Sequence, residues 1–183
     1  EYTLTVRENK QIVHSQKSAL TELDDSYVRN NMRSAGFKYF AIVNDHEHTN
    51  KAGWMGKATY SKRDFKDAQC EELSEGKHKW KNRNVLRTRI LMEDDVVLSI
   101  YNVHLEFDDE MLTKLELSNL QAFLEKDDAS IKVVIGDFNN NVDFIKQCLQ
   151  ELKSGLTHVE CGCKTGTGFT GGEPGESDTI DLV

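Results

Sequence analysis

The sequence predicts an α/β fold, and three features of its hydrophobic pattern support that prediction. Residues 96–105 and 131–138 are apolar on both faces, which is typical of strands buried inside a sheet. An amphipathic helix is expected between them, so that strand, helix and strand follow one another as a βαβ-like unit. Residues 85–92 alternate strictly, with Arg87 and Arg89 on one side, which indicates a strand with one face in water.

The earlier elements are predicted from local composition. A helix over 19–34 is expected to end near Gly36, because glycine readily adopts the conformation that stops a helix. The aromatic and β-branched residues of 37–45 and the alternation of 55–61 indicate two strands. The acidic residues 93–95 are expected to form a turn that leads into the first buried strand.

Two helices are predicted around the second buried strand. The first is expected to begin at Asp108 or Asp109, whose carboxylate can cap the free backbone N–H groups. The second is predicted over 142–155, with Gly155 at its end. The buried stripe of the first helix is predicted to consist of Met111, Leu115, Leu120 and Phe123.

Length and charge bound the organisation of the chain. With 183 residues, we expect one domain over 1–183. We expect that domain to be incomplete at both ends, because no clear first strand is visible and the last strand starts only at 179–183. There are 31 acidic and 23 basic residues, a net charge of −8, which argues against binding nucleic acid through bulk charge alone.

Composition also bounds the compartment. No apolar stretch is long enough to span a membrane, and no signal peptide is visible. The 4 cysteines favour a reduced, intracellular location, in the cytoplasm or nucleus. The pattern carries no signal for an oligomeric state.

Polar residues follow both buried strands at the point where each ends. Asn102 and His104 are two residues apart, as are Asp137 and Asn139, and such pairs point to the same face of a strand. If the strands are neighbours, all four side chains converge at one end of the sheet. Burying them costs free energy unless a partner such as a hydrated cation or a phosphate is present. The alternative is that Asp137 and Asn139 only form a turn.

Three ordered motifs resemble those of the endonuclease/exonuclease/phosphatase superfamily, the deoxyribonuclease-like phosphoesterases. They are NVHL (102–105), VVIGDFN (133–139) and TIDLV (179–183). The segment FTGGEPGESDTIDLV (169–183) is especially similar to endonuclease domains of non-LTR retroelements. The resemblance covers roughly residues 10 to 183. It implies a four-layer α/β sandwich of two mixed β-sheets flanked by helices, with the active site where the sheet ends meet.

The resemblance also implies roles for individual residues. His104 would contact the scissile phosphate and assist proton transfer, and Asp137 would orient or deprotonate the attacking water. Asn139 would hold phosphate oxygens or the metal, and Asp181 would belong to the network that supports the histidine. A Mg²⁺ ion, or Mn²⁺ in its place, held by Asp137 and Asn139 would act as a Lewis acid. The implied function is a metal-dependent phosphodiester hydrolase, with a nucleic-acid endonuclease first among the candidates.

Two departures from the family pattern leave other functions open. Lys17 stands where the family has a metal-binding Glu, and the chain ends before the family's Ser-Asp-His motif. The second hypothesis is therefore a catalytically degenerate member that binds nucleic acid or protein. A third is an inositol-phosphate or lipid phosphatase, because the motifs act on phosphorus and not on what it carries.

A local basic segment is the candidate substrate contact. Residues 76–89 contain six basic residues and Trp80 but no acid, so they could bind a nucleic-acid backbone and stack a base. The alternative is a solvated hairpin rim. The face that carries Arg87 and Arg89 is expected to be partly exposed. The residues predicted to bind substrate are Asn102, Lys77, Lys79, Trp80, Lys81 and Arg83.

Overall fold

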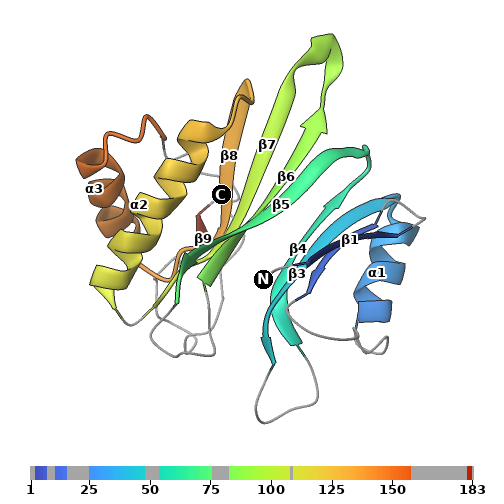
Figure 1. Cartoon of the computed structure of the whole chain (residues 1–183), viewed down its shortest axis with the longest axis horizontal. Coiled ribbons are helices and arrows are strands. Elements are labelled where there is room, and N and C mark those ends of the chain that lie inside the picture. Colours follow the sequence, from blue (N-terminus) through green and yellow to red (C-terminus); the bar gives the residue numbers. More distant parts are fainter. Residues whose placement is uncertain are drawn as a thin grey trace, which may run out of the picture.

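The computed structural model describes residues 3–7, 11–15, 25–47, 54–75, 83–107, 109–157 and 181–182. Two β-sheets lie face to face, with α1 outside one of them and α2 and α3 outside the other (Figure 1). The elements are β1 (Thr3–Arg7), β2 (Gln11–Ser15), α1 (Asp25–Ser34), β3 (Tyr39–Glu47), β4 (Trp54–Ser61), β5 (Phe65–Ser74), β6 (Arg83–Leu91), the 3₁₀ turn η1 (Glu93–Asp95), β7 (Val97–His104), α2 (Glu110–Lys126), β8 (Ile131–Asp137), α3 (Val142–Glu151) and β9 (Asp181–Leu182).

The order of strands confirms the predicted sandwich of two mixed sheets. The first sheet has the order β1-β2-β3-β4 and the second β5-β6-β7-β8-β9. Strands β2 and β3 are parallel in the first sheet, and β7 and β8 are parallel in the second. A parallel pair needs a crossover connection, and α1 and α2 lie in these two connections. The predicted βαβ unit is therefore β7-α2-β8.

Helix α1 ends where the sequence predicts. The Phe37 N–H donates to the Met32 carbonyl oxygen at 2.9 Å, and Gly36 has φ +89°. Glycine adopts this positive φ without a steric penalty, and it ends the last turn of the helix. The predicted start of the helix, at residues 19–24, lies outside the described residues.

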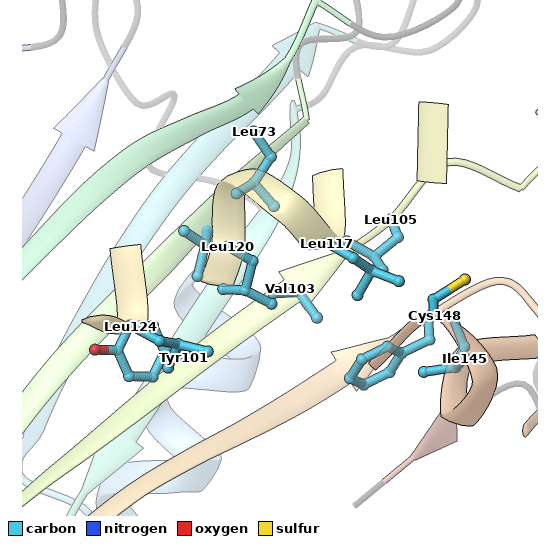
Figure 2. Packing of buried hydrophobic residues seen from close by; sticks show 11 residues of the cluster. Leu73, Tyr101, Val103, Leu105, Leu117, Leu120, Leu124, Ile145 and Cys148 are labelled. Carbon is cyan, nitrogen blue, oxygen red and sulfur yellow. The ribbon is translucent and has the colours of Figure 1, made fainter. Parts of the chain in front are cut away.

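The main core lies between the second sheet and the helices α2 and α3. Figure 2 shows Val103 and Leu105 of the β7 region facing Leu117 and Leu120 of α2, with Ile145 of α3 close by. Residues of β7 with odd numbers face these helices, so Asn102 and His104 face the other sheet. The alternation in β7 thus sends its polar tip toward the space between the sheets.

The predicted stripe of α2 is partly wrong. Asp109 caps the helix as expected, because its carboxylate accepts from the N–H groups of the first turn. Met111 and Leu115, however, are 83% and 48% exposed. The helix instead buries Thr113, Glu116, Leu117, Leu120 and Leu124. Two polar side chains take the place of the apolar ones, because both have hydrogen-bond partners in the core.

One strand was missed, and two other predictions need correction. Strand β5 was not predicted, since few of its alternating positions are apolar. Strand β6 is not wet on one face: Arg87 and Arg89 are only 12% and 13% exposed, because they pair with buried or half-buried aspartates. Helix α3 ends at Glu151, before the predicted stop at Gly155, and Lys153 adopts φ +51° just after the helix.

No helix in the described part of the chain is both long and apolar enough to cross a bilayer.

Candidate functional site

His104 and Asp137 are the last residues of two neighbouring parallel strands. They are direct partners in the register of β7 and β8, and His104 Nε2 lies 3.9 Å from Asp137 Oδ2. Their side chains are 33% and 31% exposed, so the pair is reachable from solvent. The structure therefore brings together two of the predicted catalytic residues. The register of β7 and β8 is enough to place them side by side.

Gly136 explains how the two strands come so close at this end. It has φ +128°, and a Cβ atom at this position would lie 2.1 Å from the Val103 carbonyl oxygen. No side chain fits there, so glycine is required directly before Asp137. The Leu105 N–H then donates to the Asp137 carbonyl oxygen at 2.9 Å, which continues the pairing past His104.

Asn139 holds the loop that follows β8 in a left-handed conformation, which asparagine tolerates better than most residues. Its φ is +51°, in the left-handed region that few residues other than glycine adopt. Its N–H donates to Asp137 Oδ1 at 2.9 Å, and its side-chain Nδ2 donates to the Leu105 carbonyl oxygen at 2.8 Å. The turn interpretation and the site interpretation are thus compatible. In this turn the Asn139 Nδ2 donates to the Leu105 carbonyl oxygen. The Asn139 Oδ1 accepts no hydrogen bond from the described residues.

Two further predicted residues lie at the same end of the sheet. The backbone of Asp181 in β9 pairs with Asp137 in β8. Asn102 donates from Nδ2 to the Ala58 carbonyl oxygen of β4 at 3.2 Å, which links the two sheets beside His104. The supporting role of Asp181 and the substrate contact of Asn102 both stay predictions.

Of the predicted substrate contacts in the basic segment, the structure describes Arg83. Arg83 is 6% exposed and forms an ion pair with Glu106, with Nη2 at 3.2 Å from Oε1. The prediction that Arg83 contacts substrate is therefore wrong, because a buried carboxylate already occupies its guanidinium. The other predicted contacts, Lys77, Lys79, Trp80 and Lys81, lie outside the described residues.

A buried polar group behind the site was missed by sequence reasoning. The Glu116 carboxylate accepts from the Ser74 hydroxyl at 2.6 Å and from the Glu106 N–H at 2.8 Å. Asn140 donates from Nδ2 to the Glu106 carbonyl oxygen at 3.2 Å. Burial raises the pKa of Glu116, and the hydrogen bond from Ser74 opposes the rise only in part. The only sequence signal was the acid at a helix position where the apolar stripe would continue.

The donors at the site suit a hard cation that keeps most of its water. In the ranges given above, no group of three or more His, Cys, Asp or Glu side chains is arranged to hold a metal ion. Asp137 and Asn139 nevertheless offer a carboxylate and an amide oxygen on one hydrogen-bonded turn. Mg²⁺ is often bound through one or two carboxylates with several waters, and Mn²⁺ accepts the same ligands. Lys17, predicted at the metal-binding position, lies outside the described residues.

Comparison with known proteins identifies the fold. No protein-family model and no curated protein sequence matches the chain. The structure aligns with the endonuclease/exonuclease/phosphatase family protein from Leptotrichia buccalis at a TM-score of 0.59 and 16% identity, over 79% of this chain and 57% of that one. It aligns with the human Nocturnin catalytic domain, solved with a bound sulfate anion, at a TM-score of 0.60 and 16% identity, over 89% and 65%.

A third solved structure agrees with these two. The endonuclease/exonuclease/phosphatase from Beutenbergia cavernae aligns at a TM-score of 0.58 and 15% identity, over 86% of this chain and 48% of that one. The chain thus spans less than two thirds of the length of each, at most 65%. At these identities the likeness establishes the fold, which confirms the fold that the sequence resemblance implies. The closer similarity to retroelement endonucleases stays a prediction.

Proposed function

We propose that the chain is a metal-dependent phosphodiester hydrolase that acts on nucleic acid. The observation that carries the proposal is the pairing of His104 with Asp137 at the ends of β7 and β8, with Asn139 hydrogen-bonded to the same aspartate. Proteins of the same fold include endonuclease/exonuclease/phosphatase family members, and one was solved with a tetrahedral anion bound. Both facts support a site for a phosphate ester.

Each residue has a task in this reaction. The Asp137 carboxylate is placed to orient a water molecule and to accept its proton, because one oxygen is held by Asn139 and the other faces His104. His104, partly open to solvent, is placed to donate a hydrogen bond or a proton to the phosphate ester. A Mg²⁺ or Mn²⁺ ion held by Asp137 and Asn139 would supply Lewis-acid stabilisation of the developing negative charge.

The topology supports nucleic acid as the substrate. Strand β5 ends at Ser74 and β6 begins at Arg83, and these two residues are paired. The ion pair of Arg83 with Glu106 places both strand ends next to the segment that follows His104. The basic stretch 76–82 joins these two ends, so its anchoring points lie at the same end of the sheet as the site. We propose that Lys77, Lys79 and Lys81 contact the phosphate backbone and that Trp80 stacks on a base.

The test compares Asp137, the last residue of β8, with Asp94 in the turn that precedes β7. Asp137→Asn should lower phosphodiester cleavage by about 100-fold or more, because the carboxylate that accepts the proton is lost. Asp94→Asn is the matched control: Asp94 is exposed in the turn at the other end of β7 and has φ 57°, which asparagine tolerates. Cleavage is measured on DNA, RNA and an inositol phosphate, with Mg²⁺ and with EDTA.

The outcomes separate the three hypotheses. Cleavage of nucleic acid that EDTA and Asp137→Asn both abolish supports the proposal. Salt-dependent binding of DNA or RNA without any cleavage would identify a binding module instead. Turnover of the inositol phosphate alone would identify a phosphatase. Equal activity of the Asp137→Asn and Asp94→Asn variants would overturn the assignment of the site.

A further inference from the structure

Three charged side chains lie buried behind the candidate site, between the second sheet and α2. Arg83 is 6% exposed, Glu106 1% and Glu116 0%. We call these three residues the charged anchor. One cation faces two acids, so the group is not neutral when all three are ionised. Burying such a group costs free energy, and an apolar residue at position 116 would continue the core stripe of α2. The charges therefore call for a role beyond filling space.

The charged anchor forms hydrogen bonds with one stretch of backbone, residues 106–107, and with side chains of the sheet. Glu116 Oε2 accepts from the Glu106 N–H at 2.8 Å, and Glu106 Oε1 accepts from the Phe107 N–H at 3.1 Å. Arg83 Nη2 lies 3.2 Å from the same Glu106 oxygen. On its other side, Glu116 accepts from the Ser74 hydroxyl at 2.6 Å. Strands β5 and β6 and helix α2 thus all hold residues 106–107.

The held segment is continuous with the candidate site. It begins two residues after His104, and its carbonyl oxygens support the loop after β8. The Leu105 carbonyl accepts from Asn139 Nδ2 at 2.8 Å, and the Glu106 carbonyl accepts from Asn140 Nδ2 at 3.2 Å. A shift of residues 105–107 would therefore move His104 on one side and Asn139 on the other.

We infer that the charged anchor of Arg83, Glu106 and Glu116 positions His104 and Asn139 for the reaction. The anchor acts through the backbone of residues 105–107 and does not touch substrate, so its members are positioning residues. The inference rests on the proposed function for its catalytic consequence. Its geometric consequence, the placement of His104, can be measured without any reaction.

The acceptor geometry at Glu116 gives the sharpest variant. In Glu116→Gln, the amide oxygen can accept from the Glu106 N–H while Nε2 donates to the Ser74 hydroxyl. The bond from Glu106 is kept, the bond with Ser74 is kept with its direction reversed, and the charge is lost. In Glu116→Leu, both are lost in a side chain of similar size. Positioning predicts that the glutamine variant behaves like the wild type and the leucine variant does not.

A milder pair of variants provides a matched control. Ser74→Ala removes one hydroxyl donor from Glu116, and Tyr101→Phe removes one hydroxyl donor from Asp127, the buried acid at the other end of α2. Each deletes a single buried hydroxyl that donates to a carboxylate. Only Ser74 belongs to the surroundings of the charged anchor, so only Ser74→Ala should alter the site. This pair also serves if Glu116→Leu does not fold.

The experiment measures the NMR signals of the His104 imidazole together with kcat and KM for phosphodiester cleavage in Mg²⁺. Glu116→Leu should shift the His104 signals and lower kcat by about 100-fold, and Ser74→Ala by about 10-fold, with KM within about 3-fold of the wild type. Glu116→Gln and Tyr101→Phe should leave both readouts near the wild type.

Two results would overturn the inference. One is unchanged His104 signals in both Glu116→Leu and Ser74→Ala. The other is a glutamine variant as impaired as the leucine variant, which would indicate a purely electrostatic or structural effect. Failure of the proposed function looks different: the wild type then cleaves nothing, and the His104 signals alone decide whether the charged anchor positions the histidine.

Discussion

Glu116 in α2 and Asp127 at its C-terminal end are both buried carboxylates. They accept similar hydrogen bonds, but the charged side chains around them differ. Glu116 accepts from the Ser74 hydroxyl and the Glu106 N–H. Asp127 accepts from the Tyr101 hydroxyl and the Ala129 N–H. Each thus has a hydroxyl donor and a backbone donor, and both residues are buried, but the Ser99 hydroxyl also lowers the pKa of Asp127.

The two carboxylates also differ in the cations around them. Asp127 Oδ2 lies 3.9 Å from Arg87 Nη1, and Asp127 Oδ1 lies 3.8 Å from Arg89 Nε. Burial alone would raise the pKa of Asp127, yet its hydrogen bonds and Arg87 lower the pKa overall. Glu116 shares one guanidinium, that of Arg83, with a second acid, and burial raises its pKa. Hydrogen bonds and a neighbouring arginine together favour the charged form of Asp127, whereas burial outweighs them at Glu116.

The contrast separates a stabilising cluster from a functional one. Two arginines face Asp127 and also pair with the more exposed Asp67 and Asp128. Tyr101 adds a phenol whose pKa is raised by burial and by its hydrogen bond to Asp127. That cluster ties the end of α2 to the middle of the sheet. Among the described residues, the charged anchor has one arginine for two acids, and it lies next to His104. Some proteins retain such costly groups for conformational specificity, and we infer that role for the charged anchor.

The largest effect on stability is expected from Asp127→Ala. This change removes the carboxylate that accepts from the Tyr101 hydroxyl and forms ion pairs with two largely buried guanidinium groups, and arginine cannot lose its proton. We expect the free energy of unfolding to fall by about 3 kcal/mol, at the low end for a broken buried pair, because Asp67 still pairs with both arginines.

Urea denaturation at neutral pH measures this loss. The control is Asp128→Ala, which also removes a partner of Arg89 but at a side chain that is 84% exposed. It should cost below about 1 kcal/mol, because solvent screens an exposed ion pair. Equal losses in the two variants would show that burial does not set the strength of this cluster.

A smaller loss is expected from the equivalent change in the charged anchor, Arg83→Met. It leaves Glu106 and Glu116 buried without their cation. We expect a cost of about 2 kcal/mol, below that of Asp127→Ala, because a buried acid can take up a proton and become neutral. The double variant Arg83→Met with Glu106→Gln should regain more than half of the loss in a double-mutant cycle. A double variant that is worse than the single one would contradict the comparison.

The sequence predicts the site better than it predicts the charged anchor. His104, Asp137 and Asn139 could be placed because each follows a buried apolar strand, and because a strand-helix-strand unit makes those strands parallel neighbours. Gly136 is required at this end because β8 lies too close to β7 for a side chain there. These inferences need only short-range pattern and the geometry of a βαβ unit.

The arginines could not be placed in this way, because their partners are distant in sequence. Arg83 pairs with Glu106, and Arg87 with Asp67, which lie 23 and 20 residues away. A basic residue looks exposed until the acid that covers it is known. The same reason explains the error in α2. Glu116 looks like a solvent-facing residue, while Met111, at 83% exposed, looks like core.

The smallest effect, and the sharpest test of the comparison, is the pH dependence of stability. Glu116 has a folded-state pKa above its ordinary value, so the folded chain holds this proton more tightly than the unfolded chain does. Its contribution to stability is present at low pH and is lost as the pH rises through the folded-state pKa. Asp127 has a lowered pKa, so its contribution is present at neutral pH and is lost as the pH falls through the folded-state pKa.

Glu116→Gln and Asp127→Asn should therefore remove opposite slopes from the stability curve. The glutamine variant should lack the loss that the wild type shows on rising pH, and the asparagine variant should lack the loss on falling pH. The melting temperature of each variant and of the wild type, measured by calorimetry from about pH 3 to about pH 8, gives both slopes. If the two substitutions flatten the same side of the curve, the two carboxylates do not differ in charge balance, and the electrostatic distinction between the charged anchor and the Asp127 cluster is wrong.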